Sequence, residues 1–243
     1  MKQLIQPALL ATILLAYSSC TNAQNSHQMK EEQLTAAQAQ APDLHYAYEL
    51  AVWRAKEAPE KHRDLILNQT NKGLAQLKGF VKRTVYQCID DPNLLFDWVA
   101  WDNMADALQA AKAMPTIPEL NTFVGLIENT VVFEHYAIHD YHQKAQGNRG
   151  IVELVVYQLN PDAAIHEFKQ AYSTGMAQAT GYQNRYILEN SKGENQWAEF
   201  VYWQSAANAK SAAKTMQGNP AIGKVFQNVK EVKLVHHYFK KLD

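Results

Sequence analysis

FDWVAWDNMADALQAAKAM (residues 96–114) returns later in the chain as AEFVYWQSAANAKSAAKTM (residues 198–216). In both copies an apolar segment ends in a tryptophan, Trp101 or Trp203, and an alanine-rich segment follows at once. The first segment reads as a strand and the second as a helix, which an asparagine or a serine can cap just after the tryptophan. The chain therefore contains the same strand–helix unit twice.

Further pairs of segments hold the same register, a shift of about 102 to 104 residues. They are YELAVWR (48–54) with VELVVYQ (152–158), GLAQLKGFVKR (73–83) with GMAQATGYQNR (175–185), and His135-Tyr136 with His237-Tyr238. A register kept along nearly the whole of both halves is the signature of an internal repeat. The sequence therefore predicts a duplicated unit.

Each copy reads as strand, helix, strand, strand, helix, strand. Proline follows the first strand, and turn-forming residues separate the two middle strands, as DDPN (90–93) and NSKGEN (190–195). This order is that of the split βαβ, or ferredoxin-like, unit, in which helices cover one face of a four-stranded antiparallel sheet. We therefore predict an α+β protein with tandem ferredoxin-like domains at residues 45–143 and 150–241.

The second face of each predicted sheet is also apolar. Alternation in the first strand predicts that Tyr48, Leu50 and Val52 lie on the helix-covered side, and that Glu49 and Trp53 point the other way. The strand-ending tryptophans belong to this second face in the same interpretation, and rings of that size are rarely left in water. The two domains are therefore expected to pack sheet to sheet within one chain, as an internal pseudo-dimer.

Charge and length limit the classes of partner. The chain has 243 residues, with 23 basic and 24 acidic side chains and no basic stripe. Binding to nucleic acid requires a concentrated positive field that neutralises phosphates. We therefore expect no nucleic-acid partner.

The N-terminus has the order of a bacterial export signal, with Lys2, an apolar run and then small residues. Two interpretations remain open: a signal peptide over residues 1–23, or a lipoprotein signal that ends before an acylated Cys20. Residues 24–44 read as a flexible linker, because they are polar and rich in Gln and Ala. The protein is therefore expected to be exported, either to the periplasm or to a lipid-anchored place in the bacterial envelope.

Cysteine and histidine spacing argues against a metal site. Without Cys20, Cys88 has no partner for a disulfide and reads as a buried structural residue on a strand. His135 and His139 would lie two pleats apart on one strand, about 13 Å, which is too far to share an ion. We therefore expect no metal.

This pattern resembles the dimeric α/β-barrel superfamily, and most closely the antibiotic-biosynthesis-monooxygenase (ABM) group. The resemblance rests on the strand that ends in tryptophan, the alanine-rich helix, the loop with small residues and proline, and the final strand. It covers residues from about 46 to 240, in two copies. It implies a barrel fold and either cofactor-independent oxygenation of aromatic molecules or degradation of haem.

The haem-degrading members of this group have three characteristic residues. Those relatives have an Asn on the first strand, a Trp in the second helix and a haem-binding His in the short helix that follows. This chain has Ala110-Ala111 and Ala212-Ala213 in the second helices, and the following segments LNTFVG and IGKVFQ contain no His. We therefore expect neither haem nor another cofactor.

Four ionisable positions recur in both copies, on predicted strands. They are Glu49 and Glu153, Asp97 and Glu199, Arg83 and Arg185, and His135 and His237. Buried charges need partners, so a carboxylate–Arg–His cluster is expected between the two sheets. In a catalytic interpretation His135 or His237 is the general base, and Arg83 or Arg185 stabilises an enolate-like anion.

Eight positions, which include the four carboxylates just named, are expected to bind the substrate. They are Glu49, Glu153, Trp53, Tyr157, Asp97, Glu199, Trp101 and Trp203. His62 and His166 also correspond to each other, on the first helix, whereas His139, His142 and His236 occur in one copy only.

The function predicted is binding of a small aromatic or hydrophobic molecule, with cofactor-independent monooxygenation. The alternative is a non-catalytic binding or envelope-associated protein in which the ion pairs only lock the sheets together.

Overall fold

The structure is a computed structural model that describes residues 45–144, 150–163, 165–193, 195–217 and 227–243. The expected export signal, Cys20 and the linker lie outside the described residues. In the described part of the chain, no helix is both long enough and apolar enough to span a membrane.

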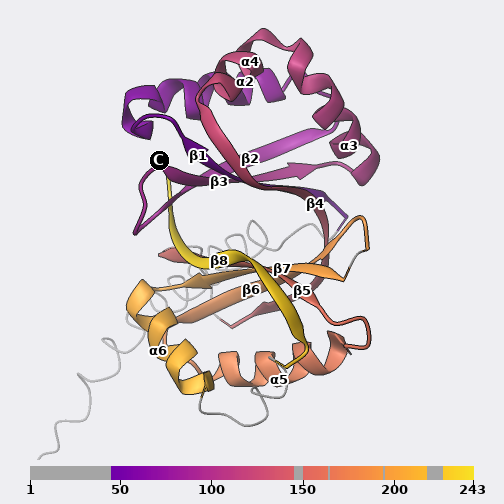
Figure 1. The fold of residues 1–243 in the computed structure, drawn as a ribbon, viewed down its shortest axis with the longest axis vertical. Helices are drawn as coiled ribbons and strands as arrows, with labels where there is room; N and C mark the ends of the chain where they lie inside the picture. Colours follow the sequence, from indigo (N-terminus) through magenta and orange to yellow (C-terminus); the bar gives the residue numbers. More distant parts are fainter. Residues whose placement is uncertain (1–44, 145–149, 164, 194, 218–226) are drawn as a thin grey trace, which may run out of the picture. The chain divides into compact units, whose positions relative to one another are not determined.

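The described elements follow the predicted order in both halves of the chain (Figure 1). Residues 45–144, called the first half, contain β1 (Ala47–Ala55), α2 (Thr70–Leu74), β2 (Phe80–Cys88), β3 (Leu94–Trp101), α3 (Met104–Ala113), α4 (Pro118–Gly125) and β4 (Ile127–Gln143). Short turns of helix at Pro59–His62 and Leu65–Gln69 precede α2, and another at Met114–Thr116 precedes α4. Residues 150–243, called the second half, contain β5 (Ile151–Leu159), α5 (Ile165–Ala177), β6 (Tyr182–Asn190), β7 (Gln196–Trp203), α6 (Ala206–Gln217) and β8 (Val229–Lys241).

The eight strands close into one barrel in the order β1-β3-β2-β8-β5-β7-β6-β4, and each described pair is antiparallel. The first half contributes the run β4-β1-β3-β2 and the second half the run β8-β5-β7-β6. These runs join where β2 pairs with β8 and where β4 pairs with β6. The helices lie on the outer side of each run (Figure 1). The prediction of an α+β fold with a barrel is therefore confirmed.

Both helices that follow a tryptophan begin in the same way. Asn103 accepts a hydrogen bond from the backbone N–H of Asp106, and Ser205 accepts one from that of Asn208. Gly79 and Gly181 precede β2 and β6 with φ of 79° and 78°, and a Cβ atom there would lie 2.5 Å from the capped turn. Glycine is required at these turns because both the backbone conformation and the close contact exclude a side chain.

The assignment of the sheet faces made from the sequence is wrong. Tyr48, Leu50 and Val52 belong to the cluster inside the barrel, together with residues of the second half. Trp53 and Glu49 instead lie on the outer side, where Trp53 packs with helical side chains. The physical reason is that both faces are buried, so alternation separates two sets of residues without telling which set the helices cover.

The three large tryptophans expected between the sheets are also under helices. Trp53 meets Phe123 of α4 edge to face with ring centroids 5.1 Å apart. Trp101 packs against α3 and α4, and Trp203 against α5 and α6. The barrel closes through different aromatic residues.

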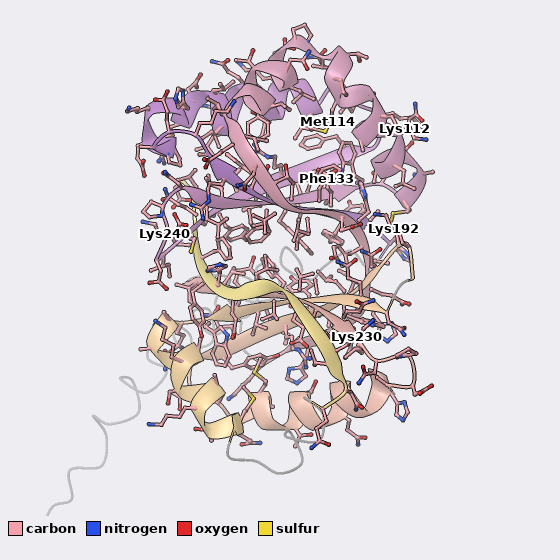
Figure 2. The ribbon with its side chains drawn as sticks, in the orientation of Figure 1. Lys112, Met114, Phe133, Lys192, Lys230 and Lys240 are labelled. Carbon is pink, nitrogen blue, oxygen red and sulfur yellow. The ribbon has the colours of Figure 1, made fainter. Side chains whose placement is uncertain are left out.

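A cluster of rings from both halves occupies the barrel interior, where side chains of the two sheets meet (Figure 2). Trp98 of β3 stacks between Tyr48 of β1 at 4.5 Å and Phe200 of β7 at 4.9 Å. Phe96 also contacts Phe239 of β8, with centroids 5.2 Å apart. Aromatic pairs add about 0.5–1.5 kcal/mol each to the effect of burial. These contacts therefore bind the two halves to each other.

A buried pair of hydroxyls makes the stability of the barrel depend on pH. Tyr86 and Tyr202 come from opposite halves, and their hydroxyl oxygens lie 2.7 Å apart. Burial raises the pKa of Tyr86 to about 12, although the hydrogen bond with Tyr202 opposes the rise. An unfolded tyrosine ionises near pH 10, so this contribution to stability is complete below about pH 10 and is lost as the pH rises through about 12.

We predict that this group alone lowers the free energy of unfolding by on the order of 2 kcal/mol between pH 10 and pH 12. Urea denaturation across this range should show the decrease in the wild type, and a smaller one in Tyr86→Phe. Tyrosinate absorption of the folded protein should lose a step near pH 12 in the variant. Loss of a step near pH 10 instead would contradict the burial of this hydroxyl.

Candidate functional site

An arginine–carboxylate pair lies beneath the helices of the first half. Arg83 donates two hydrogen bonds to Asp97, at 3.0 and 2.9 Å, and both side chains are almost fully buried. The same guanidinium donates to the backbone oxygen of Ile66 and to Asn71 Oδ1. Burial raises the pKa of Asp97, and Arg83 opposes that rise through its charge and hydrogen bonds. The pair is held in place by the helical segment that covers it.

The second half contains the corresponding pair. Arg185 donates to Glu199 from Nε at 2.9 Å and from Nη2 at 2.7 Å, and Tyr157 donates to the same carboxylate at 3.1 Å. The third nitrogen, Nη1, lies 3.2 Å from Ser173 Oγ on α5. Pairing of these arginines with these carboxylates agrees with the sequence-based expectation, but each pair lies within one half and under its helices, not between the sheets.

The histidines of the two halves are not equivalent in space. In the first half Glu49 lies opposite His135, whose Nε2 is 3.2 Å from Glu49 Oε2. In the second half Glu153 lies opposite Tyr238, so that Tyr238 and not His237 stands where His135 does. The expected correspondence of His135 with His237 is therefore wrong by one residue, because the inserted bulges of β8 change the spacing between strands.

This shift separates the expected catalytic histidines from each other. His237 belongs with the barrel-interior side of β8, where its Nδ1 lies 3.8 Å from the sulfur of Cys88. Cys88 is buried on β2, as expected, and burial raises the pKa of its thiol. The place of His237 in a helix-covered site is thus taken by Tyr238, whose pKa is raised to about 12 by burial.

The partner of the first-strand glutamate also differs between the halves. Glu153 accepts a hydrogen bond of 2.6 Å from the indole N–H of Trp203. Glu49 turns to His135 instead, and the indole N–H of Trp101 has no hydrogen-bond partner among the described side chains. The two halves therefore use the same residue types in two different polar arrangements.

Apolar side chains close the helix-covered face of the first half. Leu242, which follows β8, donates its backbone N–H to Val85 and packs its side chain with Trp53, Ile66 and Phe123. The guanidinium of Arg83 lies 5.1 Å from the centroid of the Phe123 ring. The ion pair of this half is thereby embedded in a packed core.

A pocket opens in the second half, between α5 and the end of β4. It has a volume of about 320 Å³ and is lined by Asp140, Tyr141, His142, His166, Gln170 and Ser173. The last three recur at helical spacing along α5, so they form one face of that helix. Across the β4–β6 pair, His142 lies opposite Arg185 and Asp140 lies opposite Ile187. The pocket therefore adjoins the Arg185–Glu199 pair, to which Ser173 connects it.

Comparison of the halves explains why this pocket is open. Val85 and Ile187 correspond to each other in the repeat, but the first has Leu242 beside it and the second has Asp140. Leu242, from the end of the second half, thus fills a position beside Val85 whose counterpart beside Ile187 is occupied by Asp140 and open space.

No pattern in the sequence points strongly to this site. His142 and Asp140 lie on the last part of β4, which runs 17 residues from Ile127 to Gln143 and crosses from its pairing with β1 to a pairing with β6. Because Asp140 corresponds in place to Leu242, and His142 occurs in one copy only, residues that recur in both copies do not point to either. His166 was noted as a recurring helical histidine, and it does line the pocket, whereas His62 lies near Glu57, at 3.7 Å.

The residues of the pocket have a defined chemistry. Imidazoles can take up and return a proton near neutral pH, and an arginine with one nitrogen directed to Ser173 can favour a negative charge nearby. Within the described ranges, no three His, Cys, Asp or Glu side chains converge as a metal site would require.

Comparison with known proteins bears on the fold. No known family profile and no curated protein sequence matches the chain. Among solved structures, an anthrone oxidase-like protein superposes with a TM-score of 0.64 at 15% identity, over 82% of this chain and 92% of that protein. A Fusobacterium nucleatum protein provisionally described as a monooxygenase has a TM-score of 0.59 at 11% identity, over 82% and 93%.

A mutant chlorite dismutase from Candidatus Nitrospira defluvii also superposes with a TM-score of 0.59, at 10% identity and over 83% and 93% of the two chains. At such identities the likeness concerns the fold. The chain thus has the α+β barrel fold of monooxygenase-like and chlorite dismutase-like proteins.

We predict that Arg185→Met lowers the free energy of unfolding by about 3–5 kcal/mol, because Glu199 is left buried without its cation. The double variant Arg185→Met/Glu199→Leu should recover most of this loss, since both charges are then absent. Chemical denaturation of the three proteins measures the difference. Equal destabilisation by the single and the double variant would show that the charge is not what matters.

Proposed function

We propose that the chain is a tandem pair of ferredoxin-like domains and that its second half binds a small aromatic molecule in the pocket between α5 and β4. The repeated register, the matched Arg83–Asp97 and Arg185–Glu199 pairs and the equivalent helix caps support duplication. The first half serves as a packed scaffold, and the second has diverged into a binding domain.

One observation carries the proposal: a pocket of about 320 Å³ lies beside a buried arginine, and two imidazoles line it. This volume is at the small end of the range for ligand pockets, about 300–1,000 Å³. The pocket is an open depression, so it suits a molecule of two or three fused rings that is covered on one side and has one hydroxyl or carbonyl group. His142 and His166 offer flat ring surfaces, and Ser173 and Gln170 offer hydrogen bonds.

The same arrangement supports cofactor-independent oxygenation. His142 would remove a proton from an activated CH₂ group or a phenol, and Ser173, held by Arg185, would stabilise the resulting oxyanion. The electron-rich anion would then reduce dioxygen directly, with the overall change R₂CH₂ + O₂ → R₂C=O + H₂O. Two electron pairs leave the substrate, one oxygen atom enters it and the other leaves as water, so the substrate itself is the reductant.

This proposal reassigns the base that the sequence suggested. His135 is buried against Glu49, and His237 stands beside Cys88, whereas His142 lines the pocket. Arg185 keeps its expected role near the anion. Glu199 holds that arginine, Tyr157 holds Glu199, and Glu153 and Trp203 are hydrogen-bonded to each other.

A non-catalytic binding protein is the second candidate. The observation in its favour is that Arg185 is already neutralised by Glu199 through two hydrogen bonds, which limits the charge it can offer a bound anion. Oxygen uptake separates the two candidates, because a binding protein would hold an aromatic ligand and consume no dioxygen.

We predict that anthrone, a tricyclic ketone with an activated CH₂ group, binds the wild-type protein and is bound at least tenfold more weakly by Gln170→Trp, whose indole fills the pocket. Isothermal titration measures the affinity, and an oxygen electrode measures turnover. Gln178→Trp is the matched control, because Gln178 follows α5 and lines a separate cavity. Absence of binding, or equal binding by the two variants, would refute the site.

Export to the bacterial envelope, through the signal at residues 1–23 or through acylation of Cys20, is a separate proposal. Its support is the order of charged, apolar and small residues in the sequence. We predict that the full chain expressed in a Gram-negative host partitions with membranes and that Cys20→Ser moves it to the soluble periplasmic fraction. A wild-type protein found only in soluble fractions would contradict acylation, and one found only in the cytosol would contradict export.

A further inference from the structure

His142 and Tyr182 touch at two places. The Nδ1 atom of the His142 ring lies 2.9 Å from the hydroxyl oxygen of Tyr182. The same hydroxyl donates a hydrogen bond of 3.2 Å to the backbone oxygen of His142. Tyr182 begins β6 and His142 is near the end of β4, so the contact joins the neighbouring strands β6 and β4 beside the pocket.

When both contacts are hydrogen bonds, the number of protons available decides the state of the imidazole. A phenol hydroxyl has one proton, and a backbone oxygen can only accept. With that proton directed to the backbone oxygen, the hydroxyl oxygen must accept at its other contact, so Nδ1 of His142 has to carry the hydrogen. In the neutral ring the lone pair is then on Nε2.

The surroundings of Tyr182 keep its hydroxyl protonated. Burial raises the pKa of Tyr182, and Glu199 raises it further, while Arg185 opposes them. The phenol is therefore a neutral hydrogen-bonding group beside the pocket.

The first half shows that the hydroxyl is not needed for packing. Phe80 is the counterpart of Tyr182 in the repeat, and its ring meets Trp101 at 5.7 Å and 73°. Tyr182 meets Trp203 at 5.7 Å and 74°. Since the same edge-to-face contact forms with phenylalanine, the hydroxyl of Tyr182 is an addition to the second half, where the pocket is.

We infer that Tyr182 is a positioning residue that holds His142 in the Nδ1–H tautomer, so that Nε2 is the basic nitrogen of the pocket. The geometric part stands on the two contacts, and the catalytic part rests on the proposed function. Without this hydroxyl a neutral histidine distributes its proton between the two nitrogens, and the Nε2–H form cannot accept a proton at Nε2.

The tautomer can be read directly by long-range ¹H–¹⁵N correlation spectroscopy of the full-length, ¹⁵N-labelled protein, at a pH about two units above the ordinary histidine pKa. Signals of His142 are identified by their absence in His142→Asn. We expect a pyrrole-type shift for Nδ1 and a pyridine-type shift for Nε2. A protonated Nε2 in the wild type would overturn the inference.

Tyr182→Phe tests the cause, and Phe80 shows that the fold accepts this ring. We expect the Nε2 signal of His142 to move toward the protonated shift in this variant. Tyr202→Phe is the control, because it removes a buried hydroxyl inside the barrel without touching His142. An unchanged tautomer in folded Tyr182→Phe would overturn the role of Tyr182.

Turnover separates the inference from the function on which it rests. With anthrone as substrate, we expect Tyr182→Phe to lower kcat at least tenfold and to change KM by less than threefold. Unchanged kcat with an altered tautomer would overturn the catalytic role of Nε2. If the wild type fails to bind anthrone while its tautomer is as stated, the proposed function fails and the assignment of the tautomer stands.

Discussion

Burial of both faces of the central strands β1, β3 and β7 is the constraint on which this structure depends. Inside the barrel, large rings such as Trp98 and Phe200 interlock across the two halves. On the outer side, helices cover a face that carries both tryptophans and charges. Because the faces of these strands are shielded from water, each carboxylate buried on them needs a cation or a donor, which the Arg83–Asp97 and Arg185–Glu199 pairs provide.

The two halves bury their arginine–carboxylate pairs in different ways. In the first, Leu242 and Phe123 complete an apolar cover over the ion pair. In the second, α5 and β4 leave a pocket next to the arginine. Two halves with the same order of elements allow this division, since one half can stay tightly packed while the other has a pocket. The stability of the whole barrel then does not have to come from the half that has the pocket.

Several features of the fold could be predicted from the sequence. The repeat of residues 96–114 in 198–216 indicated the order of elements, and composition together with alternation indicated buried strands. The direction in which each strand faces could not be predicted, because β3 and β7 are buried along their whole length and alternation alone does not identify the helix side. The pairing of arginine with carboxylate could be expected, because burial of an unpaired charge costs free energy. The location of the pairs could not, because it depends on which face of each strand the helices cover.

The candidate site was harder to predict for a different reason. Positions were sought where both copies agree, whereas the pocket arises where they differ. The bulges in β8 place Tyr238 rather than His237 opposite Glu153, a shift of one residue that reverses which side chain reaches the helices. The long reach of β4 brings Asp140 and His142 to the second half, and no local pattern reports which strand will be the neighbour.

That reach of β4 has a consequence for how such a protein can change. The wall of the second half's pocket is supplied by the segment that leaves the first half, so neither half encodes the pocket alone. In a symmetric pair of identical subunits, any substitution on this strand would alter two equivalent pockets at once. When the two halves are joined in one polypeptide, the strands that cross between them can mutate independently. One half can then change the residues of its pocket while the other half stays tightly packed.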